Sequence, residues 1–199
     1  MDSDLVEAVS RLKAIFEKRK LPAVFGTAAK ALLDDIKKRI RLPGRYRSFL
    51  LEANPVKVHT VTPVECIQLF SADDLVREQV GFSLDENLNP RSDDAWRKSW
   101  VVVGRSSLLG DPYFIDTAKL DAEGDCPVYT AMSGTERWDP TLAASSFVQF
   151  LQILALAMEV AEGFGNADVG VDDEDVFREA LAPKIRPIDP AAFRVGYWT

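Results

Sequence analysis

One stretch, Trp100–Asp116, constrains the fold more than any other part of the chain. It opens with Trp-Val-Val-Val-Gly at 100–104, and an apolar, β-branched run bounded by glycine predicts a strand buried on both faces. The Gly-Asp-Pro at 110–112 predicts a tight turn, because these three residue types favour turn backbone conformations. The stretch therefore predicts a β-hairpin with a long connection, in which Tyr113 and Phe114 point to opposite faces of the sheet.

Apolar residues recur at helical spacing on both sides of this hairpin. They do so in residues 5–16 and 32–40, and again in a long apolar stretch that ends near Met158. A helix-start signal at Asp139-Pro140-Thr141 places the beginning of this last helix there. We expect an α+β fold in which the N-terminal helices and a long closing helix pack on a mostly antiparallel sheet. The expected strands lie near Val56, Glu65, Trp100, Tyr113 and Pro127.

The chain length of 199 residues suits one domain with decorated ends. Composition changes at Gly163, and three prolines and an aromatic ending at 193–198 follow. We therefore expect a single domain over residues 1–162. Residues 163–199 are expected to form a C-terminal extension that packs on or beside it.

The net charge of −7 argues against a sequence-independent nucleic-acid binder, which normally presents a basic surface. The charge is unevenly distributed. Residues 1–52 hold 12 Lys and Arg against 7 Asp and Glu, whereas residues 53–199 hold 12 against 24. This pattern predicts either a solvated basic helix pair beside an acidic sheet, or an acidic face that attracts a cationic partner.

Cysteine usage and hydropathy indicate the compartment in which the protein is expected to function. Cys66 and Cys126 form no CxxC motif and the chain has one histidine, so no zinc site, and no other metal or cofactor, is expected. Both thiols are expected to be reduced. The start of the chain lacks the apolar core of a signal peptide, and the apolar stretch 147–161 is short for a membrane span. These features predict a soluble, cytoplasmic protein with no membrane partner.

Enzyme signatures are scarce. His59 is the only histidine, no nucleophile motif accompanies it, and no glycine-rich phosphate-binding motif is present. Asp111 and Asp116 bracket the predicted turn and could form the acid/base pair of a small hydrolase. The simpler interpretation is a turn former and a strand terminator, so we predict no catalytic residues and no enzymatic activity.

The central stretch has matching companions elsewhere in the chain. Residues 42–51 contain Leu-Pro followed by Tyr and Phe-Leu, residues 127–129 read Pro-Val-Tyr, and 142–154 is an apolar helix-like segment. In this order the motifs resemble the SMI1/KNR4 family of the SUKH superfamily, over roughly residues 27–162. Asn54-Pro55 stands where the family usually has Asn-Gly.

The resemblance implies a protein-binding function. Bacterial members of the family often act as immunity proteins that neutralise a cognate polymorphic toxin, and many such toxins are nucleases. An acidic protein could mimic the phosphates that fill a nuclease channel. Fungal members suggest an alternative, an intracellular scaffold or regulatory protein.

Polar loops beside the expected sheet are the candidate contact regions. Residues 81–95 form a long acidic loop, and long loops are often functional. The tryptophan after this loop is either an anchor for a partner or a cover for the sheet edge. The candidate partner-binding residues are Asp85, Asp93, Asp94, Trp96, Asp111 and Trp138.

Overall fold

The computed structural model describes residues 2–91, 95–135, 137–164 and 173–199. These residues form helices and an antiparallel sheet, so the predicted α+β class is confirmed. The elements in chain order are α1 (Ser3–Lys18), β1 (Val24–Gly26), α2 (Lys30–Ile36), α3 (Gly44–Ala53), β2 (Asn54–Val56), β3 (Val58–Val61), β4 (Cys66–Leu69), η1 (Arg77–Gln79), β5 (Trp100–Ser106), β6 (Pro112–Asp116), β7 (Val128–Thr130), β8 (Thr141–Ala144), α4 (Phe147–Ala161), η2 (Glu162–Phe164), α5 (Glu174–Ile185) and α6 (Pro190–Val195).

The main sheet follows the chain, with strand order β3-β4-β5-β6-β7-β8 and every neighbouring pair antiparallel. The predicted hairpin is confirmed as β5 and β6. Its two aromatic residues point to opposite faces, as expected: Tyr113 contacts Phe150 of α4, at 5.5 Å between ring centroids. Phe114 contacts Trp100 on the other face, at 4.7 Å. A separate two-stranded sheet pairs β1 with β2.

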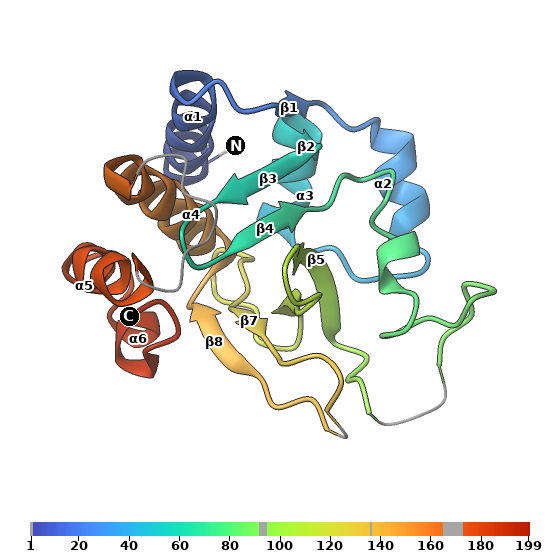
Figure 1. The fold of residues 1–199 in the computed structure, drawn as a ribbon. Helices are drawn as coiled ribbons and strands as arrows, with labels where there is room; N and C mark the ends of the chain where they lie inside the picture. Colours follow the sequence, from blue (N-terminus) through green and yellow to red (C-terminus); the bar gives the residue numbers. More distant parts are fainter. Residues whose placement is uncertain (1, 92–94, 136, 165–172) are drawn as a thin grey trace.

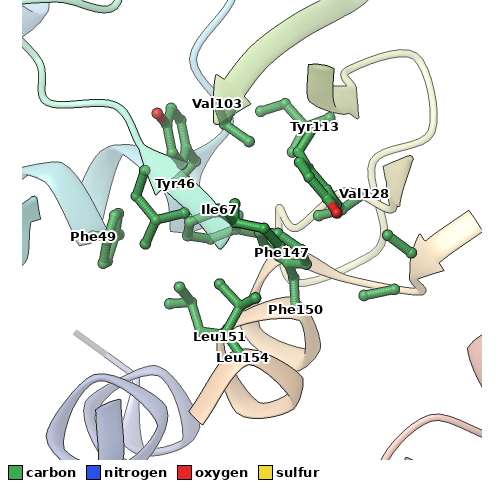
Figure 2. Close-up of a cluster of buried hydrophobic side chains, with 14 of the residues drawn as sticks. Tyr46, Phe49, Ile67, Val103, Tyr113, Val128, Phe147, Phe150, Leu151 and Leu154 are labelled. Atoms are coloured by element: carbon green, nitrogen blue, oxygen red, sulfur yellow. The ribbon is translucent and has the colours of Figure 1, made fainter. Parts of the chain in front are cut away.

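One part of the core lies between one face of this sheet and α4, and another part, which includes Trp96, Trp100 and Phe114, lies on the other face. Figure 2 shows α3, the sheet and α4 contributing side chains to one cluster, including Phe49, Ile67, Val103, Phe147 and Leu151. Helix α1 lies beside α4 (Figure 1). By length and composition the 18 residues Phe147–Phe164 could cross a membrane, yet 61% of this stretch is buried inside the structure, as in the central helix of a globular domain.

The predicted start of the closing helix is wrong. Thr141–Ala144 forms β8, which pairs with β7, and α4 begins only at Phe147. The side chain of Ser146, whose backbone is extended, caps this helix by accepting a hydrogen bond from the Gln149 amide at 3.1 Å. Strand pairing with β7 thus outweighs the local helix-start signal.

The C-terminal helices lie against α4 and β8 (Figure 1). The buried carboxylate of Asp189 caps α6 and accepts hydrogen bonds from the amide and hydroxyl of Ser145, at 2.5 and 2.8 Å. The Trp198 indole donates to the Ala143 carbonyl of β8 at 2.7 Å. These contacts attach the end of the chain to the sheet.

Candidate functional site

Three large apolar side chains are exposed together at one end of the β5–β6 hairpin. Leu108 and Leu109 lie on the turn and are 52% and 73% exposed, and Met132, just after β7, is 68% exposed. The Ser133 amide donates to the Asp111 carboxylate at 2.6 Å, and the Ser133 hydroxyl donates to the Gly110 carbonyl at 3.1 Å. These bonds hold the two loops side by side. We call Leu108, Leu109 and Met132 the apolar tip.

A buried serine sets the shape of the turn. The Ser106 hydroxyl accepts hydrogen bonds from the amides of Leu108 and Leu109, at 3.3 and 3.1 Å. It also donates to the Glu65 carboxylate at 2.8 Å. The turn is therefore fixed from below, and its two leucine side chains are left facing solvent.

Glu65 links this turn to the C-terminal end of the chain. The Tyr113 hydroxyl donates to the Glu65 carboxylate at 3.3 Å and also forms a hydrogen bond with the Tyr197 hydroxyl. Burial raises the pKa of Glu65 and raises the pKa of Tyr113 well above its ordinary value. The residues after α6 therefore support the turn through a buried polar network.

We expect Glu65→Gln to stabilise the fold more at neutral pH than at pH 4. Burial raises the folded-state pKa of Glu65 above its ordinary value of 4.5, so the folded protein holds this proton more tightly than the unfolded chain does. Wild-type stability is therefore lost as pH rises through the folded-state pKa, and an uncharged amide avoids that loss. Urea unfolding of both proteins from pH 4 to pH 8 measures the difference.

The control Glu17→Gln makes the same change of side chain at an exposed position of α1, outside this buried network. A Glu65→Gln advantage that stayed constant across this range, or shrank as pH rose, would contradict the assignment.

The predicted anchor Trp96 is buried, with 4% of its surface exposed. Its indole donates to the Trp100 carbonyl at 3.0 Å, and its ring lies 4.7 to 5.2 Å from the rings of Phe82, Phe114 and Trp138. Trp96 therefore covers the sheet, and its side chain is not available as a surface anchor. Trp138 is half-buried on top of it and lines a hollow of about 640 Å³.

The remaining predicted contact residues have separate settings. The Asp85 carboxylate accepts hydrogen bonds from the amides of Asn87 and Asn89, each at 2.9 Å, and so shapes its own loop. Asp111 lies at the apolar tip. Asp93 and Asp94 lie outside the described residues. The structure thus brings together Trp96 and Trp138, and it ties Asp111 of the β5–β6 turn to Ser133 of the β7–β8 connection, which also carries Trp138.

The alternative acid/base pair is wrong on geometry. Asp111 precedes β6 and Asp116 ends it, so their Cα atoms lie about 16 Å apart at a rise of roughly 3.3 Å per residue. Paired carboxylates of glycosidases lie about 5 to 9.5 Å apart. Asp116 is buried and accepts a hydrogen bond from the Ala118 amide at 3.1 Å, in keeping with the end of a strand.

Sequence reasoning missed the apolar tip. A signal was present, because two adjacent leucines directly before a Gly-Asp-Pro turn are unusual in a polar connection. Met132, before Ser133-Gly134, gave no comparable signal.

Comparison with known proteins agrees with the fold. No curated protein sequence matches the chain. A family model for the SMI1/KNR4 family (SUKH-1) matches residues 28–153, which run from the segment before α2 into α4 and include the whole main sheet. The chain therefore belongs to the SMI1/KNR4 family (SUKH-1), which is a family of protein-binding or immunity-type modules.

Proposed function

We propose that this protein is a non-enzymatic immunity protein that binds and neutralises a cognate bacterial toxin through the apolar tip. The observation that carries the proposal is the exposure of Leu108, Leu109 and Met132 at one site. Apolar side chains gathered on a surface mark protein interaction sites, because burying them on binding is favourable. Family membership supports a protein partner in general.

The rigidity of the turn also favours binding. Association loses free energy when loops and side chains must be ordered, and a preorganised surface loses less. The Leu108 and Leu109 amides are already bonded to Ser106, and Asp111 is bonded to Ser133. The backbone of the tip therefore needs little rearrangement to meet a partner.

The proposal places the protein in the cytoplasm, with no cofactor and with a protein as partner. Cys66 and Cys126 are free thiols, which suits a reducing compartment. The alternative is a scaffold or regulatory protein of the SMI1/KNR4 type. It would use a similar surface for a housekeeping partner, and the identity of the captured protein separates the two.

The test combines capture with rescue. Tagged protein is used to capture partners from the native host, and a captured toxin is then co-expressed with it in a sensitive strain. We expect wild type to protect the cells and Leu109→Asp/Met132→Asp to bind at least 100-fold more weakly. Burying two such side chains contributes about 3 kcal/mol or more, which corresponds to roughly 100-fold in affinity.

A matched control keeps the charge change but moves it elsewhere. Val24 and Val195 are 58% and 48% exposed, and Val24→Asp/Val195→Asp should protect the cells as wild type does. Equal protection by the Leu109/Met132 variant would remove the apolar tip from the mechanism. Capture of only signalling or envelope proteins would favour the scaffold alternative.

A further inference from the structure

Three neighbouring hollows share lining residues and are lined by cations. The first, of about 640 Å³, includes Trp138 and shares Trp100 with the second, of about 190 Å³. The second shares residues 39–41 with the third, of about 500 Å³. We call this surface the basic trough. Its cations are Lys37, Lys38, Arg39, Arg41, Arg97, Lys98 and Arg137.

The trough carries a clear excess of positive charge. Among the described residues that line it, Asp139 is the single acid. All seven cations are exposed. Lys38 pairs with Asp35 outside the trough at 2.6 Å, and the Arg97 guanidinium lies 5.0 Å from the centre of the Trp100 ring. A protein with a net charge of −7 thus has a surface whose described lining residues are mostly cations.

We propose that the basic trough binds an acidic segment of the protein partner. The inference rests on the proposed protein-binding function and adds the charge of the bound segment. Charge complementarity argues for it directly, since a groove lined by one sign of charge concentrates the opposite sign. It adds a basic contact surface to the acidic and aromatic contact residues that the sequence predicts.

The aromatic end of the trough adds a second requirement. Trp138 and Trp100 line the first hollow beside the guanidinium groups of Arg97 and Arg137. Such a surface suits an apolar or aromatic side chain flanked by carboxylates, because the ring faces supply apolar contact and arginines form strong hydrogen bonds with carboxylates. The proposed ligand is therefore an acidic segment with at least one apolar side chain.

A nucleic acid suits the trough less well. At its far end the lining residues Gly44 and Gly124 adjoin a further hollow, whose charged lining residues are the four acids Asp4, Asp121, Glu123 and Asp125 and one cation, Arg45. Arg45 pairs with Asp4 and Glu123, so the acids of this hollow remain in excess. Phosphates repeat along a nucleic-acid strand, so a strand that left the trough at this end would meet a hollow with an excess of negative charge. A protein segment can change its charge along its length and avoid that repulsion.

The experiment measures fluorescence anisotropy of a labelled 12-residue peptide of Asp and Glu with one central Phe, added to the full chain. We expect saturable binding to wild type. Binding should be at least tenfold weaker for Arg97→Glu/Lys98→Glu/Arg137→Glu. The control Lys20→Glu/Lys184→Glu/Arg194→Glu makes the same change of charge at exposed cations outside the trough, and it should retain most of the affinity. The single substitution Arg137→Gln, at an exposed position, should also weaken binding of the peptide.

Three results would overturn the proposal: no saturable binding to wild type, an equal loss in the control, or tighter binding of a single-stranded RNA of the same length. The proposed function is judged separately, by rescue of toxin-expressing cells. Failure of wild type to rescue would reject the proposed function, whereas peptide binding that is equal in the trough variant and wild type would reject the trough. Each result can occur without the other.

Discussion

Gly104→Ala is expected to lower the free energy of unfolding by about 2 to 3 kcal/mol. Gly104 lies within β5, between β4 and β6, and a Cβ atom there would be 2.7 Å from the backbone carbonyl oxygen of Gln68. A backbone atom cannot rotate away as a side chain can, so β4 and β5 would have to separate. Overpacking of this kind typically costs about 1 to 3 kcal/mol. Urea unfolding followed by tryptophan fluorescence measures the loss.

Gly26 provides the matched control, because it also lies in a strand and a Cβ built on it would have no atom within 4 Å. Gly26→Ala should change the free energy of unfolding by less than about 0.5 kcal/mol, or stabilise slightly by restricting the unfolded chain. If the two substitutions had equal effects, close approach of β4 would not be the reason for the glycine in Trp-Val-Val-Val-Gly.

Local patterns predicted the hairpin and the two faces of β6, because alternation and turn residues act over a few positions. They placed the end of the first strand at Gly104, whereas β5 continues to Ser106. They also assigned Thr141–Ala144 to a helix. In both places backbone pairing with a distant strand decides the structure, and a single sequence carries no direct signal for such pairing.

The binding surfaces were harder to predict than the fold, since each is assembled from distant segments. Residues 37–41, 97–98 and 137 meet only in the folded chain to form the basic trough. The distribution of charge along the sequence left two interpretations open, a solvated basic helix pair beside an acidic sheet or an acidic face that attracts a cationic partner, and neither is a basic contact surface. Trp96 shows the same limit: the sequence left open whether it anchors a partner or covers the sheet edge, and only its packing against Phe82 and Trp138 in the folded chain decides for the second.

Asp125→Ala is expected to lower the free energy of unfolding by about 3 kcal/mol. Asp125 is 2% exposed, and its carboxylate accepts hydrogen bonds from the amides of Phe147 and Val148, at 2.9 and 3.2 Å, and from Cys126 at 2.7 Å. The first amides of a helix have no partner within it. Removal of the carboxylate leaves buried donors unpaired at the start of α4, each costing about 1 to 3 kcal/mol.

The neighbouring Asp121 separates this effect from the simple loss of an acidic side chain. Its carboxylate also accepts two amide hydrogen bonds, from Glu123 at 2.9 Å and Asp125 at 2.8 Å, but on an exposed turn. Water can replace it there, so Asp121→Ala should cost no more than about 1 kcal/mol. Asp125→Asn keeps one acceptor oxygen, so its loss in the free energy of unfolding should lie between the losses of the two alanine variants. Equal losses for Asp121→Ala and Asp125→Ala would show that α4 does not depend on this carboxylate for its N-terminal hydrogen bonds.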